Sequence, residues 1–481
     1  MNLFMLAPEL SLFCLAILVI VLDLFVERKG LLQTVSFVGL IVPVGLFVLL
    51  LIGRQEPADT STFNGMLLVD SFSLFFKFLL VIIAALVVMF STEYVAKFPR
   101  FQGEYYGLIL FSTAGMMLMA SSGELISIYI ALELTSLSLY ALVCFLKDNK
   151  STEAGLKYLL LGSLSSAVLL YGMALVFGIT GTTNLAGIAK AIAAEGTLRN
   201  PALLMGMTLL VAGFGFKIAS VPFQMWVPDV YEGAPTPITG FLSVASKAAG
   251  FAVVLRVFYT AFGSPDWVVS NWSTLFAILG AVSMTFGNIV ALTQTNIKRM
   301  LAYSSIAHAG YIMVGLAAVG LAGSSGVIFY LAGYAMTNLG AFIAIVAISE
   351  RINSDQINDY AGMAKRSPLV ALGLAVALLS LTGIPPTAGF VGKLYVFNAA
   401  VQNGLLWVVI IAVLNTVVSA YYYLRVVRVM YLAEPASAEK VGASGTVNAA
   451  LFLATAAVVV IGFVPAPLIS AAEAAARVFR P

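Results

Sequence analysis

Apolar segments of about 20 residues follow one another along almost the whole chain. A helix of that length crosses the roughly 30 Å of hydrocarbon in a bilayer and satisfies its backbone hydrogen bonds internally. Charged residues make up only 10% of the 481 residues, whereas they make up about a quarter of a soluble domain. The chain is therefore an integral membrane protein. No segment indicates strands, so we expect an all-α polytopic bundle.

Fourteen segments have the length and composition of a membrane span. They cover residues 4–26, 32–53, 67–90, 106–121, 123–146, 157–180, 202–219, 238–262, 273–294, 301–320, 325–349, 368–400, 405–432 and 448–470. The 202–219 segment continues past Pro222, and the 368–400 segment is too long for one simple span and contains "GIPPTAGF". Because proline interrupts the backbone hydrogen-bond pattern, we expect a discontinuous helix at both places.

Residues 1–26 resemble a secretory signal peptide only superficially. They lack a basic start, and Asp23, Glu27 and Arg28 follow the apolar run without a small-residue cleavage site. We interpret this segment as the first span.

Basic residues between the spans are distributed unequally. The loops after odd-numbered spans, together with the span ends that adjoin them, hold fifteen: Arg28, Lys29, Lys97, Arg100, Lys147, Lys150, Lys157, Lys298, Arg299, Arg351, Lys365, Arg366, Arg425, Arg428 and Lys440. The loops after even-numbered spans hold three: Arg54, Lys190 and Arg199. Cytoplasmic loops of membrane proteins carry the excess of Lys and Arg. We therefore expect a cell inner membrane protein with the odd loops in the cytoplasm and both termini on the non-cytoplasmic side.

The residues that bind metals and cofactors are scarce. The chain has two cysteines, Cys14 and Cys144, and one histidine, His308. An iron–sulfur cluster needs about four thiolates, so this chain cannot hold one alone, and a haem or metal site is not expected. The sequence also has no Walker A motif, dinucleotide fingerprint or nucleophile elbow. The net charge of +3 is spread over many loops, and no nucleic-acid partner is expected.

Five basic residues fall inside the expected spans: Lys77, Lys217, Lys247, Arg256 and Lys393. Glu133 is the acid most clearly inside a span, whereas Asp23 and Asp70 lie nearer to span ends. A charge at the centre of a bilayer costs about 2.5–3.5 kcal/mol on insertion scales. These side chains must therefore face protein or water, and most should be paired.

Structural roles are favoured for two of these residues. Lys77 could extend its ammonium group to the membrane surface (snorkelling) or could brace a neighbouring helix. Arg256 keeps its charge and exchanges protons poorly, so an ion pair is its expected role. Asp70 could cap the third span or could have a functional role.

The remaining four, Glu133, Lys217, Lys247 and Lys393, are central, titratable and placed in broken or Gly/Ser-rich helices. Burial favours the neutral form of a lysine and a nearby carboxylate favours the charged form, so a buried lysine beside a carboxylate that can move is a two-state proton site. We expect these residues to form a polar file along the membrane midplane. Hydroxyl groups close by in the sequence could hold water between them: Thr135, Ser136, Ser220, Ser243 and Ser246.

His308 lies in "LAYSSIAHAGY", near Tyr303, Ser304, Ser305 and Tyr311. A lone histidine is commonly a hydrogen-bonded core residue. Imidazole also changes charge near neutral pH, which suits proton relay. Both readings stay open at this point.

The segment "VPDVYEGAPTPITG", residues 227–240, is rich in proline, glycine and acid and has no basic residue. It is interpreted either as a rigid loop or as a hinge or proton entry near Asp229 and Glu232.

A short internal repeat is also visible. "GFGFK" at 213–217 and "GFVGK" at 389–393 share the pattern Gly-Phe-x-x-Lys, each in a proline-interrupted segment. They lie about five spans apart, so the two copies would cross the membrane in opposite directions. Broken helices at matching positions of inverted repeats indicate a transport site.

Four longer motifs carry a resemblance to a known family: "KYLLLGSLSSAVLLYGMALVFGITGTTNL", "PFQMWVPDVYEGAPTPITGFLSVASKAAGF", "NIKRMLAYSSIAHAGYIMVG" and "GIPPTAGFVGKLYVF". The chain resembles, over essentially its whole length, the subunit N family of proton-pumping NADH-quinone oxidoreductase, or complex I. The resemblance implies an antiporter-like fold of fourteen helices with two inverted five-helix repeats and discontinuous helices seven and twelve. Its segments would be residues 1–105 (three helices), 106–262 and 273–432 (the repeats) and 448–470 (helix fourteen).

The resemblance also implies a role for each central residue. Glu133 matches the fifth-helix acid, Lys217 the proton-bearing lysine of the seventh helix and Lys247 the connecting lysine of the eighth. His308 matches a relay position of the tenth helix, and Lys393 matches the twelfth-helix lysine. The related subunit M usually carries a glutamate there, and subunit L has a long C-terminal arm. Both differences favour the subunit N family.

The expected function is proton translocation coupled to electron transfer from NADH to quinone. The subunit itself would be non-redox within a translocase, with FMN, iron–sulfur clusters and quinone in other subunits. Its expected partners are the lipid bilayer, protons, the antiporter-like subunit M and small K/J-type subunits. The alternatives are a subunit of a multi-subunit cation/proton antiporter without redox chemistry, and a structural scaffold whose charges are only ion pairs.

Overall fold

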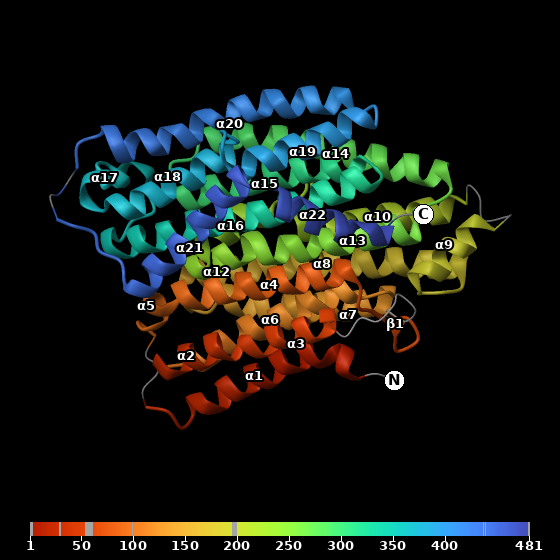
Figure 1. The fold of residues 1–481 in the computed structure, drawn as a ribbon, viewed down its shortest axis with the longest axis horizontal. Helices are drawn as coiled ribbons and strands as arrows, with labels where there is room; N and C mark the ends of the chain where they lie inside the picture. The colour runs from red at the N-terminus through yellow and green to blue at the C-terminus, as the bar shows by residue number, and fades with distance from the viewer. Residues whose placement is uncertain are drawn as a thin grey trace.

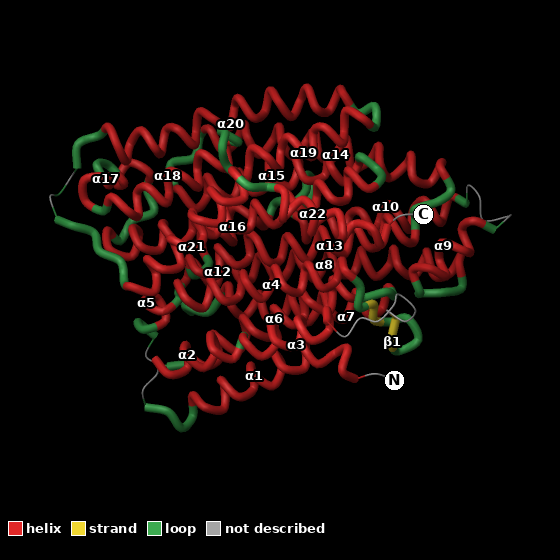
Figure 2. The backbone as a smooth tube through the Cα atoms, in the orientation of Figure 1, coloured by secondary structure: helices red, strands yellow, loops and turns green. Residues whose placement is uncertain are grey.

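Long helices lie side by side along one axis of the molecule (Figure 1), and the chain has little structure besides helix and short connections (Figure 2). The computed structural model describes residues 3–27, 30–52, 61–98, 100–194, 200–435, 437 and 439–479, with only the backbone at 61 and 62. Arg28, Lys29, Arg54 and Arg199, which belong to the charge count above, lie outside the described residues.

The first half of the chain contains helices η1 (Leu3–Leu6), α1 (Ala7–Asp23), α2 (Gly30–Gly39), α3 (Ile41–Ile52), α4 (Ser71–Phe90), α5 (Thr92–Val95), α6 (Gln102–Ser121), α7 (Leu125–Val143), α8 (Asn149–Thr180), α9 (Leu185–Ala193), α10 (Pro201–Ile218), α11 (Trp226–Gly233), α12 (Thr236–Phe241), η2 (Leu242–Ser246), α13 (Lys247–Arg256) and η3 (Val257–Ala261). The second half contains α14 (Asp266–Leu292), α15 (Ile297–Ala317), α16 (Leu321–Ile352), η4 (Ile357–Tyr360), α17 (Met363–Arg366), α18 (Pro368–Thr382), α19 (Ala388–Gln402), α20 (Leu406–Leu432), α21 (Gly445–Phe463), α22 (Ala466–Ala476) and η5 (Arg477–Phe479).

The expected spans are all helical. Within the described residues, 12 helices are long and apolar enough to cross a membrane. The two expected spans not among them correspond to α6, which is less apolar, and to the broken pair α18–α19. The chain enters and leaves the bundle at the same end (Figure 1), as an even number of crossings requires. The count of fourteen and the inverted repeats stay predictions.

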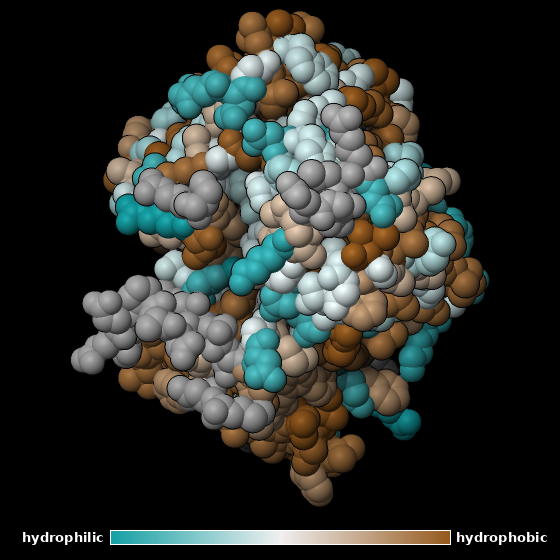
Figure 3. All heavy atoms as spheres, turned by 90° about the vertical axis from the view of Figure 1, so that its right-hand side faces the viewer, coloured by the Kyte–Doolittle hydropathy of each residue, from teal (hydrophilic) through white to brown (hydrophobic). Residues whose placement is uncertain are grey.

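The connections after odd-numbered expected spans lie together at one end of the bundle. Lys97 forms an ion pair with Glu350, and Arg351 lies 3.4 Å from Glu93. These pairs join residues more than 250 positions apart. The opposite end, where the two termini lie, shows hydrophilic residues over its face and apolar residues around much of its margin (Figure 3).

Both predicted helix breaks are present, and side chains satisfy the opened backbone. At the first break, α10 ends at Ile218 and Ala219 adopts φ 63°. The Ser283 hydroxyl accepts a hydrogen bond of 2.9 Å from the Val221 amide, and the Trp226 indole donates to the Phe216 carbonyl at 3.0 Å. At the second break, between α18 and α19, the Ser380 hydroxyl accepts from the Gly389 amide at 3.1 Å.

A third break, which the sequence analysis did not predict, interrupts the last expected span. α21 ends at Phe463, and α22 starts at Ala466 after Pro465. The proline stands where a continuous helix would need an amide donor. The two pieces together run from residue 445 to 476 and lie across the bundle (Figure 1).

The helix that carries Lys247 is irregular at both ends. Residues 242–246 and 257–261 are π-helical, and α13 lies between them. In a π-helix each amide bonds to the carbonyl five residues earlier, and such turns often mark functional sites. This whole stretch, Thr236–Ala261, is buried inside the bundle.

One short hairpin departs from the all-α expectation. β1 (Ser61–Thr62) pairs antiparallel with β2 (Leu67–Leu68), with Ser61 opposite Leu68. The turn between them has positive φ at Phe63, Asn64 and Gly65. The Asn-Gly pair in this turn is the strongest short-range hairpin signal in a sequence.

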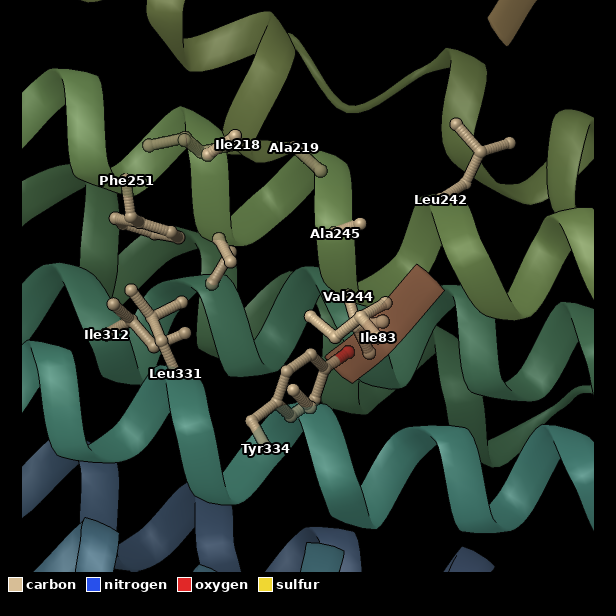
Figure 4. Close-up of a cluster of buried hydrophobic side chains, with 14 of the residues drawn as sticks. Ile83, Ile218, Ala219, Leu242, Val244, Ala245, Phe251, Ile312, Leu331 and Tyr334 are labelled. Atoms are coloured by element: carbon tan, nitrogen blue, oxygen red, sulfur yellow. The ribbon is translucent and has the colours of Figure 1, made fainter. Parts of the chain in front are cut away.

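Apolar side chains pack closely around the two helices that carry the first lysines. Ile218 and Ala219 of the first break and Ala245 of η2 lie in one buried cluster with Leu331 and Tyr334 of α16 (Figure 4). The polar residues described next are therefore enclosed by a well-packed interior rather than by a wide channel.

Candidate functional site

Three buried lysines and one buried histidine are held by neutral oxygen atoms. The exposed fractions are 4% for Lys217, 2% for Lys247, 4% for Lys393 and 3% for His308. Within the described residues, none of the three lysines forms an ion pair. A buried lysine without a carboxylate has no full negative charge beside it to fix it in the charged form.

Lys217 lies in the last turn of α10, immediately before the first break. Its Nζ donates to the Ser136 hydroxyl of α7 at 3.1 Å. Gly250 of α13 faces its stem, because a Cβ at that position would stand 3.3 Å from Lys217 Cγ. The side chain is thus held between α7 and α13.

Glu133 lies one helical turn from Ser136 on α7. It forms no ion pair with Lys217 within 4.0 Å. Its carboxylate instead accepts a hydrogen bond from the Ser166 hydroxyl of α8. Glu133 is therefore close to the partner of Lys217 but does not itself form an ion pair with Lys217. The atom that Lys217 contacts is the Ser136 hydroxyl, which was predicted only as a group that could hold water.

Lys247 begins α13 and reaches α15. Its Nζ donates to both the carbonyl and the hydroxyl of Ser305. The same hydroxyl lies 3.2 Å from the hydroxyl of Tyr231, the buried tyrosine of α11. Tyr231 was not predicted as a site residue, although it stands in the acidic motif at 227–240.

His308 lies one turn after Ser304 and Ser305 on α15. Its Nδ1 lies 2.8 Å from the Tyr330 hydroxyl of α16, and its Nε2 lies 3.2 Å from the Tyr423 hydroxyl of α20. Tyr423 also bonds to the Ser304 hydroxyl. Both ring nitrogens therefore join a hydrogen-bonded chain, but the tyrosines come from distant segments rather than from Tyr303 and Tyr311.

A cavity of ≈ 10 Å³ lies beside His308. It has room for about one water molecule. Tyr334, Thr337, Ser380 and Leu381 share its lining, and the Thr337 and Ser380 hydroxyls lie 3.0 Å apart. The Leu381 carbonyl accepts a hydrogen bond from Lys393, so this cavity lies between His308 and Lys393.

Lys393 lies in the second turn of α19, after the second break. Its Nζ donates to the carbonyls of Leu381 at 3.1 Å and Thr382 at 2.9 Å, which are the last residues of α18. A helix carboxyl end carries partial negative charge and favours a cation. The Tyr311 ring adds a cation–π contact, with Nζ 4.6 Å from its centroid.

The two Gly-Phe-x-x-Lys motifs are not equivalent in the structure. Lys217 lies before its break and Lys393 lies after its own. The prediction that these motifs are copies of one position is therefore wrong. The residues near the two breaks are similar only in composition, because both breaks need small residues and proline.

The other two intramembrane cations are paired with carboxylates. Lys77 Nζ lies 2.7 Å from Glu9 Oε1, and both side chains are fully buried. The Arg256 guanidinium donates hydrogen bonds to both carboxylate oxygens of Asp70 and to the Ala120 carbonyl. It also lies over the Phe72 ring in a cation–π contact. The predicted structural roles of Lys77 and Arg256 are confirmed, and Asp70 serves both as helix cap and as ion-pair partner.

Sequence reasoning missed Glu9, the partner of Lys77. Its position in the first turn of α1 made it look like a residue of the span end. The available signal was that Glu9 and Asp23 are the only acids in residues 4–26.

The acidic motif forms helix α11 rather than a loop. Asp229 bonds to Lys157 and Arg299, each at 2.8 Å, and Glu232 bonds to Lys150 at 3.0 Å. Partial burial acts to raise the pKa of Asp229, but the hydrogen bonds from Lys157 and Arg299 outweigh it and lower the pKa. This ion-pair network favours the rigid structural reading of the segment, and its basic partners come from α8 and α15.

Comparison with known proteins identifies close relatives. Residues 122–419 match the family model described as NADH:quinone oxidoreductase/Mrp antiporter, TM. The chain is 46% identical over 485 residues to an NADH-quinone oxidoreductase subunit N of Dehalococcoides mccartyi, covering 99% of both chains. It is also 46% identical over 482 residues to the subunit N of Desulforamulus reducens, again covering 99% of both.

Solved structures share the fold over nearly the full length. A chain of respiratory complex I from Thermus thermophilus matches with a TM-score of 0.81 and 33% identity, over 96% of this chain and 98% of that one. A chain of the Mrp complex from Dietzia sp. matches with a TM-score of 0.86 but 21% identity, over 98% and 96%. The fold alone therefore does not separate these two kinds of complex, whereas the sequence identities do.

Proposed function

The chain belongs to the subunit N family of NADH-quinone oxidoreductase, and from that premise we propose that its buried lysines and histidine carry protons across the membrane within that complex. The observation that carries the proposal is the contrast between two classes of buried cation. Lys77 and Arg256 have carboxylate partners, whereas Lys217, Lys247 and Lys393 contact neutral oxygens. A lysine that releases its proton must not be locked by a fixed carboxylate.

The hydrogen-bonded groups give an order to the transfer. Lys217 passes a proton toward Lys247 through the region of Ser220 and Ser246, whose buried hydroxyls make no hydrogen bond to described protein atoms. Lys247 donates to Ser305, and Ser304 and His308 follow on the same helix. From His308 the cavity beside Ser380 leads toward Lys393. In each step a charged ammonium or imidazolium gives up a proton, an intervening hydroxyl or water accepts it while releasing its own, and the next neutral amine or imidazole takes up the released proton.

Glu133 has a different part in the proposal. It is half-buried, and the outer face of α7 on either side of it carries Ile130 and Leu137, which are 60% and 59% exposed. A carboxylate at this depth is too costly to leave against lipid. We therefore propose that a neighbouring membrane subunit covers this face. A charge on that subunit would change how strongly Glu133 favours the charged form of Lys217.

The redox chemistry belongs to other subunits in this proposal. FMN, the iron–sulfur clusters and quinone would be bound there, and this chain would act as a non-redox part of a translocase. Subunit M and small K/J-type subunits are the proposed neighbours. The excess of basic residues in the odd loops supports an inner membrane location with both termini on the non-cytoplasmic side.

A cation/proton antiporter of the Mrp type is the second candidate, because the Dietzia structure has the same fold. It is less favoured, because relatives at 46% identity over 99% of the chain are subunits N. Co-purification of the native complex with its redox subunits separates the two functions.

Lys217→Ala tests the proposal in the intact complex. We expect the rate of NADH-driven proton uptake by inside-out vesicles to fall by about tenfold or more, as for loss of a positioned proton-transfer group. Lys365→Ala is the matched control, because Lys365 is 63% exposed and pairs only with Glu434. Both variants are compared at equal amounts of assembled complex. Undiminished proton uptake in Lys217→Ala would remove Lys217 from the pathway.

A further inference from the structure

The break in the last helix lies directly on the break that precedes Lys393. Gly462, one residue before the end of α21, faces the backbone of Pro386 and Thr387 between α18 and α19. A Cβ at Gly462 would stand 2.5 Å from the Pro386 carbonyl oxygen and 2.7 Å from the Thr387 Cα. Backbone atoms cannot rotate away as a flexible side chain would, so only glycine allows this approach.

A second contact joins the two broken helices at another place, between α19 and α22. The Tyr395 hydroxyl of α19 donates to Glu473 Oε1 of α22 at 3.1 Å, and it lies 2.9 Å from the Ser325 hydroxyl of α16. Tyr395 follows Lys393 by two residues, which places it about 200° around the helix. Glu473 therefore anchors the outer side of α19, opposite the face that carries Lys393.

The position of α19 relative to α18 decides what Lys393 contacts. Its ammonium donates hydrogen bonds to the carbonyls of Leu381 and Thr382 at the end of α18. Gly389 of α19 packs against the Ser380 carbonyl, so α18 and α19 are in close contact at the break. A shift of the connecting residues 383–387 would change the distance between Lys393 and both carbonyls.

We propose that the broken last helix is a positioning element for Lys393, which acts through Gly462 on one side of the break and through Glu473 on the other. The inference rests on the proposed function, since it names residues that hold one of its proton sites in place. Gly462 and Glu473 are positioning residues. Neither contacts Lys393 or its carbonyl partners.

Gly462→Ala is the first test. We expect the rate of NADH-driven proton pumping per assembled complex to fall by about tenfold, because a displacement of about 1 Å can cost about 100-fold at an aligned reacting group. Gly340→Ala is the matched control on the neighbouring helix α16. Its Cβ would meet Ala454 of α21 at 3.6 Å, an ordinary contact, so we expect unchanged pumping.

A double variant separates positioning from general damage. If Gly462 acts through Lys393, Gly462→Ala lowers pumping in the native chain but has no further effect in a Lys393→Ala background. A merely structural defect would lower pumping by the same factor in both backgrounds, and that result would overturn the inference. Full pumping by Gly462→Ala would overturn it as well.

The Tyr395–Glu473 contact gives an independent test if Gly462→Ala does not assemble. Glu473→Gln keeps an oxygen that accepts from Tyr395, whereas Glu473→Ala does not. We expect Glu473→Gln to pump like the native chain and both Glu473→Ala and Tyr395→Phe to pump severalfold more slowly, again without further effect when Lys393 is absent. Equal rates for Glu473→Ala and the native chain would refute the role of Glu473.

The failure of this inference differs from the failure of the proposed function. If Lys393→Ala itself pumps normally, Lys393 is not a proton site and the proposed function loses that residue. If Lys393→Ala pumps slowly but Gly462→Ala and Glu473→Ala pump normally, only the positioning role fails.

Discussion

Replacing Asp70 removes a helix cap and a buried ion-pair partner in one step, and the two losses are separable. The Asp70 carboxylate accepts from the Ser73 amide at 2.8 Å at the start of α4. It also bonds to both terminal nitrogens of Arg256, which is 3% exposed. Serine caps helices about as well as aspartate but has no charge. Asp70→Ser therefore removes mainly the ion pair, and Asp70→Ala removes both.

The two contributions have different sizes. Loss of an N-cap costs about 1 kcal/mol. Breaking a buried ion pair by removing one partner costs about 3–5 kcal/mol, because the other charge stays buried and unpaired. The Ala120 carbonyl and the Phe72 ring remain near Arg256, which favours the lower part of this range. We expect losses of about 3–4 kcal/mol for Asp70→Ser and about 4–5 kcal/mol for Asp70→Ala.

The assay is denaturant unfolding of the purified protein in lipid bilayers, followed by loss of helical circular dichroism. Arg256→Met in the Asp70→Ser background supplies the control. It removes the orphaned charge, so the double variant should recover much of the loss, as buried ion pairs replaced by apolar groups often do. The difference between the double variant and the sum of the single variants gives the coupling energy.

Two results would refute this reasoning. A loss below about 1 kcal/mol for Asp70→Ser would mean that the ion pair contributes no more than an exposed one. An additive double variant would mean that Arg256 does not depend on Asp70.

Two further predictions concern ion pairs at other positions. Glu9→Ala leaves the fully buried Lys77 without a carboxylate and should cost about 3–5 kcal/mol, with recovery when Lys77→Met is added; the yield of folded protein and the unfolding midpoint measure both effects. Asp229 and Glu232 have lowered pKa values, so their stabilising contribution is present above the pKa of the unfolded chain, about 3.9 for Asp, and is lost as pH falls through the lower folded pKa. The native chain should therefore unfold at a higher temperature than Asp229→Asn near pH 6, and the difference should disappear once the pH has fallen below the lowered pKa of Asp229; a constant difference at all pH values would contradict the assignment.

The helices and the two predicted breaks could be located from the sequence because membrane insertion imposes a strong local signal. A span must be apolar over about 20 residues, and a proline inside it removes a backbone donor. The third break was missed because residues 448–470 were interpreted as one continuous apolar span, although Pro465 lies inside it near its end.

The candidate site was predictable as a set of residues but not as a set of contacts. Lys217, Lys247, Lys393 and His308 stand out because a buried titratable group is costly in a membrane. Their partners, such as Ser136, Ser305, Tyr423 and the Leu381 carbonyl, lie on other helices, and no local rule gives the rotation of one helix against another. For the same reason the sequence could not identify Glu9 as the partner of Lys77.

The π-helical stretch at 242–246 makes the number of residues before Lys247 as significant as their identity. A π-helical turn holds one residue more than an α-helical turn, so deleting one residue here would restore an α-helix whose later side chains keep nearly the same direction, whereas adding one would turn every later side chain by about 100° relative to the helix before it. Lys247 would then leave Ser305 and Arg256 would leave Asp70, although no side chain had been replaced. The second π-helical stretch begins after Arg256 and could not compensate. Natural relatives should therefore accept substitutions in this stretch far more readily than an added residue.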